Sequence, residues 1–160
     1  MQKAVFSLGA IFSLALATGC ADVSVASCGA DDASEVCAVF RIVNEERADA
    51  GLPPYAWNRE LAVAAQLHAE DMVAQSYFDH ASLDGRSFAD RSIEAGYDAS
   101  PRGENIAAGQ RTAERVMSSW MGSTGHRNNI LSEGSNEIGV GLMDNHWVQV
   151  FGTRRAPAEP

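Results

Sequence analysis

The spacing of apolar residues changes along this chain, and that change limits the fold more than any other sequence feature. Up to about residue 131, apolar side chains recur every three or four residues, which is typical of helices that bury one face. Beyond that point, Ile138, Val140 and Leu142 alternate with glycines, which indicates a strand. Helices followed by antiparallel strands predict an α+β domain in which helices pack on a small sheet.

Polar residues and glycines predict where the elements begin and end. The first apolar stripe starts at Ser34, while Asn58 and Thr112 are good N-caps for two later helices. Ser87 followed by Asp90 resembles a capping box at the start of a short helix. The stripe on the second helix predicts four buried side chains: Leu61, Ala65, His68 and Met72.

The later part of the chain predicts extended structure around one more short helix. Residues 103–107 form either a short strand or an extended loop, and residues 123–131 form a tight turn into a helix. Asp144 and Asn145 are turn residues, so the strands on either side of them are expected to pair as a hairpin.

Residues 1–20 have the pattern of a signal peptide. Lys3 precedes an apolar stretch that is shorter than the roughly 20 residues of a membrane span, so we expect export. Residues 16–20 resemble a bacterial lipobox that ends in an acylated Cys20, whereas ordinary cleavage after Ala17 or Ala26 is the alternative. The expected location is therefore the periplasm or a membrane held through a lipid on Cys20, or alternatively the outside of the cell.

The segment after the leader is small, polar and acidic, and we interpret residues 21–34 as a tether. Cys28 and Cys37 are expected to form a disulfide in an oxidising compartment, which would hold the start of the first helix. The folded domain is expected to span residues 35–154, with a loose tail at 155–160.

The charge of the chain excludes one class of partner. Its net charge is −9, and its only lysine, Lys3, lies in the leader. Because binding to phosphates requires a clustered basic surface, we expect no nucleic-acid partner.

Four histidines are the main candidates for chemistry. His80 and His126 each lie in a predicted loop or helix start, where a ring nitrogen can face a cleft, and the helix dipole would favour a neutral His126. His68 lies on a buried stripe, and His146 lies at the hairpin turn, facing solvent. The spacing of these histidines alone matches no metal-binding signature.

Two hydrolase patterns are not supported by the sequence. Ser123, His126 and Glu104 could form a Ser-His-Glu set, but the chain has no G-x-S-x-G motif. It also has no H-E-x-x-H motif, so a zincin mechanism is not indicated.

Seven segments, in this order, resemble the compact bacterial branch of the CAP superfamily. This superfamily shares the SCP-type domain of cysteine-rich secretory proteins, antigen 5 and plant pathogenesis-related proteins of class 1, and the likeness covers nearly all of residues 36–153. The segments are NEER at 44–47 with GLP at 51–53, LHAEDM at 67–72, FDH at 78–80, GENIA at 103–107, Trp120 with STGHRNNIL at 123–131, IGVG at 138–141 and WVQVFG at 147–152.

The resemblance implies an α-β-α sandwich with a small antiparallel sheet and a central cleft lined by two histidines and two acids. His80, Glu104 and His126 match three of these cleft positions. Ser123 stands where eukaryotic relatives have the second acid, so the site is incomplete. Three such ligands and a water could hold zinc, with modest affinity.

The resemblance implies no single reaction, and the residues are compatible with three functions. The first is a binding module for a divalent ion, a lipid, a glycan or an envelope protein. The second is a metal-dependent peptide hydrolase, in which Glu104 is the general base for a water polarised by an ion on His80 and His126. The third is a structural role, in which these side chains only hold the loops together.

Overall fold

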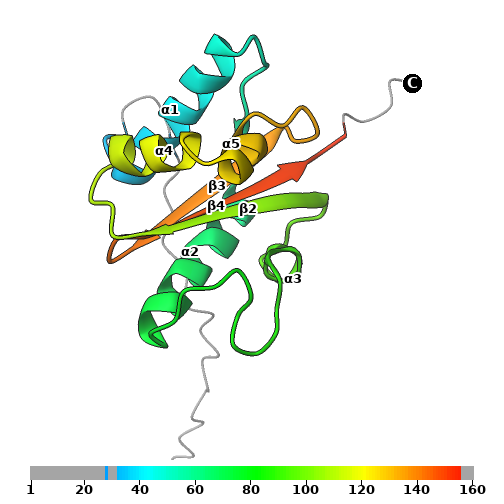
Figure 1. Ribbon diagram of the computed structural model, residues 1–160. Coiled ribbons are helices and arrows are strands. Elements are labelled where there is room, and N and C mark those ends of the chain that lie inside the picture. Colours follow the sequence, from blue (N-terminus) through cyan, green and yellow to red (C-terminus); the bar gives the residue numbers. More distant parts are fainter. Residues whose placement is uncertain (1–27, 29–31, 156–160) are drawn as a thin grey trace, which may run out of the picture.

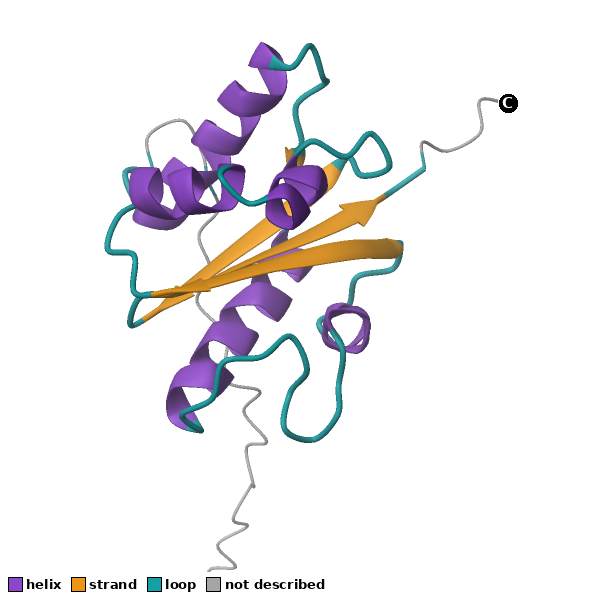
Figure 2. Cartoon of the chain, in the orientation of Figure 1, coloured by secondary structure: helices purple, strands orange, loops and turns teal. Residues whose placement is uncertain are grey.

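The protein is an α-β-α sandwich, as expected, in a computed structural model that describes residue 28 and residues 32–155. One face of a four-stranded sheet is covered by α1 (Glu35–Asp49), α4 (Ala113–Met121) and α5 (Thr124–Ile130), and the other face by α2 (Arg59–Ala74) and α3 (Phe88–Glu94) (Figures 1 and 2). The leader, Cys20 and both proposed cleavage positions lie outside the described residues.

The sheet places one strand, β2, at its edge. The strands are β1 (Ala56–Trp57), β2 (Ser100–Ala108), β3 (Glu137–Met143) and β4 (His146–Thr153), in the spatial order β1-β3-β4-β2. The predicted hairpin of β3 and β4 is confirmed, and β2 pairs antiparallel with β4. The two-residue strand β1 pairs parallel with β3, which the sequence did not predict.

The local signals in the sequence act where they were expected to act. The side chains of Asn58 and Thr112 accept hydrogen bonds from the first turns of α2 and α4, and Ser87 and Asp90 form the full capping box of α3. Asp144 and Asn145 adopt φ values of 43° and 59°, which a two-residue hairpin turn of the primed type requires.

Helix α2 packs so closely on β3 that only glycine fits at two positions of the strand. A Cβ atom on Gly139 would overlap the backbone of Ala62, and one on Gly141 would overlap the backbone of Gln66. The alternating glycines of β3 therefore let α2 lie directly on the sheet.

A hydrophobic core lies on each side of the sheet, and β4 contributes to both. Trp147 and Phe151 pack with α1 and α4, whereas Val148 and Val150 pack with α2. This alternation follows the two-residue period of a strand. It leaves Gln149 fully buried on the α4 side, where a polar side chain requires partners.

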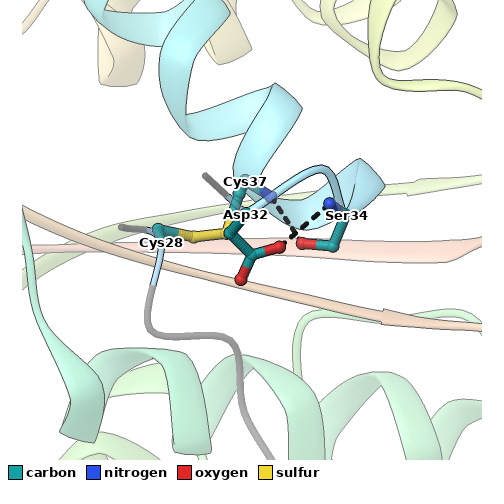
Figure 3. The surroundings of a disulfide bond; sticks show 4 residues. All are labelled: Cys28, Asp32, Ser34 and Cys37. Carbon is teal, nitrogen blue, oxygen red and sulfur yellow. Dashed lines mark hydrogen bonds between the residues drawn. A yellow bond between two sulfur atoms is a disulfide. The ribbon is translucent and has the colours of Figure 1, made fainter. Parts of the chain in front are cut away.

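The expected disulfide joins Cys28 to Cys37 and holds the chain against the start of α1 (Figure 3). Ser34 Oγ accepts a hydrogen bond from Cys37 N at 3.3 Å, and Asp32 accepts one from Ser34 N at 2.9 Å. Among the residues that the structure describes, no helix is long and apolar enough to cross a membrane.

Candidate functional site

The candidate site is built on the edge strand β2, because two consecutive residues of this strand point to opposite faces of the sheet. Glu104 faces α3 and the segment that follows α2, and Asn105 faces α5. One histidine is held from each face. His80 is bonded to Glu104, and the backbone carbonyl of His126 is bonded to Asn105.

A buried ion pair holds His80. Glu104 Oε1 lies 2.8 Å from His80 Nδ1, and Glu104 Oε2 lies 2.7 Å from an Arg91 guanidinium nitrogen. The side chains of Glu104 and Arg91 are only 1% and 5% exposed, whereas the side chain of His80 is 56% exposed. The imidazole is therefore an accessible group on a buried charged support.

Arg91 also fixes the backbone on which His80 lies. Its guanidinium donates to the carbonyl oxygens of His80 (3.0 Å) and Arg86 (2.9 Å), and to the hydroxyl of Ser82 (3.0 Å). This role of Arg91 was not predicted from the sequence. The one sequence feature that could have indicated it is the position of Arg91, a charged residue on the inner face of the short helix that Ser87 caps.

His68 supports the same segment from α2. It is fully buried, as the helical stripe predicted, and its Nε2 lies 3.0 Å from the carbonyl oxygen of Asp79. Burial lowers the pKa of His68, so the ring is neutral near pH 7 and Nε2 carries the donated hydrogen. His68 and Arg91 thus hold two successive carbonyl groups, those of Asp79 and His80.

Neutral amides hold the His126 side. Asn105 Nδ2 donates to the carbonyl oxygen of His126 (3.1 Å) and to Gln149 Oε1 (3.0 Å). Asn129 Nδ2 donates to Asn105 Oδ1 (2.9 Å) and to the Glu104 carbonyl oxygen (3.2 Å). Asn105 and Gln149 are completely buried, so these bonds supply the partners that their amides need.

The pKa values of the two imidazoles are shifted in opposite directions. The hydrogen bond to Glu104 raises the pKa of His80, an effect that burial partly opposes. Burial lowers the pKa of His126, and the nearby charge of His80 lowers it further. A neutral His126 was expected from the helix dipole, but these two causes account for it. Near neutral pH, His80 is therefore the more readily protonated ring.

The structure brings His80 and Glu104 into contact but does not form the three-ligand metal set predicted from His80, Glu104 and His126. Within residues 28 and 32–155, no group of three or more His, Cys, Asp or Glu side chains is arranged to hold a metal ion. Both oxygens of Glu104 have hydrogen-bonding partners, which are His80 and Arg91. What remains is two imidazoles, one of them backed by a carboxylate.

Ser123 and His146 make no side-chain hydrogen bond to His80, Glu104 or His126 among the described residues. Ser123 is the N-cap residue of α5, three residues before His126, and its side chain makes no capping bond. His146 is partly exposed at the hairpin, where its Nδ1 lies 3.1 Å from the Asp144 carbonyl oxygen. Its ring faces Phe78, with the ring centroids 6.2 Å apart.

Comparisons with known proteins agree with this architecture. YkwD, an uncharacterized protein of Bacillus subtilis (strain 168), is 39% identical over 115 residues, which are 71% of this chain and 45% of YkwD. An extracellular protein containing a SCP domain from Bacillus anthracis str. Ames has a crystal structure that matches with a TM-score of 0.73 and 32% identity, over 75% of this chain and 40% of that one. This chain thus spans less than half the length of either relative.

An outer surface protein from Borrelia burgdorferi shares the fold, with a TM-score of 0.67 at 23% identity over 76% of this chain and 93% of that one. The sequence profile of the cysteine-rich secretory protein family matches residues 40–151, which include His80, Glu104 and His126. Since that match covers more than half of the sequence, the chain belongs to the cysteine-rich secretory protein (CAP) family.

Proposed function

We propose that this protein is an exported CAP-domain binding module that contacts its ligand through His80 and His126. One observation carries the proposal. Both carboxylate oxygens of the buried Glu104 are engaged, one by His80 and the other by Arg91, while the His80 side chain is more than half exposed. The accessible imidazole is the recognition group, and the acid behind it is its support.

The same observation weighs against the hydrolase hypothesis. A general base needs an oxygen that can reach the attacking water. Glu104 Oε1 is turned to His80 and Oε2 to Arg91, inside a side chain that is 1% exposed. Binding requires no such open oxygen, so it is the function that this geometry favours.

A divalent ion such as zinc is the ligand that the two rings fit best. His80 directs Nδ1 to Glu104, which leaves Nε2 as the nitrogen that can act as a ligand. A carboxylate behind a histidine fixes the ring and strengthens it as a ligand. The pKa of His126 is lowered, so this ring is neutral near pH 7 and supplies the second imidazole. A lipid, a glycan or an envelope protein would be bound at the same edge of the sheet.

Export is the location that fits these features. The signal-peptide pattern, the Cys28–Cys37 disulfide and relatives described as an extracellular protein and an outer surface protein all support it. We propose a periplasmic domain or one held at a membrane through acylated Cys20, with release after ordinary cleavage as the alternative.

Isothermal titration of zinc into the purified domain tests the ion. The wild type is expected to bind, His80→Ala and His126→Ala are expected to lose the binding heat, and Glu104→Gln is expected to weaken it about 10- to 100-fold. His146→Ala is the matched control, because this histidine belongs to the hairpin and should leave the heat unchanged. Equal heats in all five proteins would exclude the site.

Activity profiling against a peptide library separates binding from hydrolysis. We expect no turnover by the wild type, with or without zinc. If the wild type cleaves a peptide and Glu104→Gln abolishes that cleavage, the hydrolase hypothesis is favoured over the binding module.

A further inference from the structure

A cavity of about 700 Å³ lies between α2, α3 and the segment that joins α2 to α3. Its lining residues place it on the face of the sheet that α2 and α3 cover. These two helices lie below the sheet in Figure 1. Its size falls within the range of about 300–1,000 Å³ that is typical of small-molecule sites. It is distinct from the His80 and His126 rings, which do not line it.

One wall of the cavity is a single face of α2, on which apolar side chains alternate with the carboxylates of Glu70 and Asp71. Val63, Ala64, Leu67 and Ala74 line it, at spacings that place them along one side of a helix. Leu67 is 43% exposed, so this face of α2 is open to solvent at the cavity. Ala95, at the end of α3, lines the cavity as well, so an apolar body would have contacts from both helices.

The charged groups of the cavity give it an acidic character. Arg86 and Arg91 line it, but Arg86 is paired with Asp84 (2.7 Å) and Glu94 (2.8 Å), and Arg91 is paired with Glu104 (2.7 Å). Both cations are therefore already balanced by carboxylates.

Two further acids of α2 line the cavity, and the hydrogen bonds found on their carboxylates come from neutral donors. Glu70 accepts from the amide of Gln66 at 2.9 Å. Asp71 accepts from the hydroxyl of Tyr77 and the amide of Gln75. The cavity thus combines an apolar wall with carboxylates in excess of its guanidinium groups, which complements an apolar molecule with a cationic head.

We propose that the cavity between α2 and α3 binds a small amphiphile that has an alkyl chain and an ammonium head. The alkyl chain lies along Val63, Leu67 and Ala74, and the head is held near Glu70, Asp71 and Glu94. This site goes beyond the His80 and His126 site, and the two are tested separately.

Binding of three eight-carbon probes tests the proposal, because they share a chain and differ in the charge of the head. Octylammonium, octanol and octanoate are titrated, each below its micelle concentration, into the uniformly ¹⁵N-labelled domain, with amide shifts and calorimetry as readouts. Octylammonium is expected to bind at least tenfold more tightly than the other two, with its shifts centred on residues 63–74 and 82–95.

Matched variants separate the acidic head site from the apolar wall. Glu70→Gln with Glu94→Gln is expected to weaken octylammonium about tenfold, and Ala74→Trp is expected to abolish binding by filling the cavity from an exposed position. Glu45→Gln and Ala48→Trp on the exposed side of α1 are the controls and should change nothing. Arg91 is left intact, because it also supports His80.

The proposal is overturned if octanoate or octanol binds as tightly as octylammonium, or if the cavity variants behave like the α1 controls. His80→Ala is expected to keep octylammonium binding, and Ala74→Trp is expected to keep zinc binding. Failure at one site therefore leaves the result at the other site interpretable.

Discussion

The two sides of β2 hold their histidines by different chemistry. On the α3 side, the charged pair of Glu104 and Arg91 supports the side chain of His80. On the α5 side, the neutral amides of Asn105 and Asn129 hold the backbone at His126. A charged support shifts the pKa of the ring that it touches, whereas an amide network fixes position without adding charge. The two imidazoles of one site can therefore differ in protonation at the same pH.

The largest effect is expected on the charged side. Arg91→Met removes the buried guanidinium from Glu104 and leaves the carbonyl oxygens of His80 and Arg86 without this donor. Loss of one partner of a buried ion pair costs about 3–5 kcal/mol, so the free energy of unfolding should fall by this amount in urea denaturation. Adding Glu104→Leu to Arg91→Met should restore part of the loss. A double variant less stable than Arg91→Met would contradict the pairing.

A smaller loss is expected on the neutral side. Asn105→Ala removes the side-chain donor to the backbone carbonyl oxygen of His126 and to the side-chain oxygen Oε1 of Gln149. The expected cost is about 1–3 kcal/mol, as for an uncharged buried hydrogen-bonding group. Because no charge is involved, this cost should be equal at pH 5 and pH 8 in thermal or urea unfolding. A loss of stability that varies strongly with pH would show that the amide network is coupled to the protonation of a nearby side chain.

The smallest effects concern the pH dependence of stability, and they should have opposite signs at the two histidines. His80 has a raised pKa in the folded state, so it stabilises the fold below pH 6.5, and this contribution disappears as the pH rises through the folded value. His126 has a lowered pKa, so its contribution is present above pH 6.5 and is lost as the pH falls through the folded value.

Urea denaturation of the metal-free single variants between pH 5 and pH 8 checks these signs. His80→Ala should lose more stability at pH 5 than at pH 8, whereas His126→Ala should remove a penalty that the wild type shows at pH 5. Each difference should be below about 1 kcal/mol, since water screens both partly exposed rings. Changes of the same sign in the two variants would contradict the opposite pKa shifts of His80 and His126.

Local chemistry made much of the fold predictable. Asn58, Ser87 and Thr112 act as caps through bonds within one helical turn, and Asp144 with Asn145 forms its turn within two residues. Such contacts depend on sequence neighbours and can be read directly from the chain. The buried stripe of α2, including His68, followed from helical spacing for the same reason.

The supports of the site could not be predicted in this way. The bonds from Arg91 to Glu104 and from Asn105 to Gln149 join residues on different elements, and no local pattern specifies which side chains will meet. The resemblance to CAP proteins predicted that His80 and Glu104 belong together, and they do touch. It did not predict that Arg91 would bond to the second oxygen of Glu104.

The most direct test of Glu104 as the support of His80 is an NMR pH titration of the histidine rings in metal-free wild type and Glu104→Gln. In the wild type, His80 should titrate above its ordinary pKa of 6.5 and His126 below it. Glu104→Gln should lower the pKa of His80, because it removes the carboxylate beside the ring. A wild-type His80 that titrates at or below 6.5, or one that Glu104→Gln leaves unchanged, would contradict this role for Glu104.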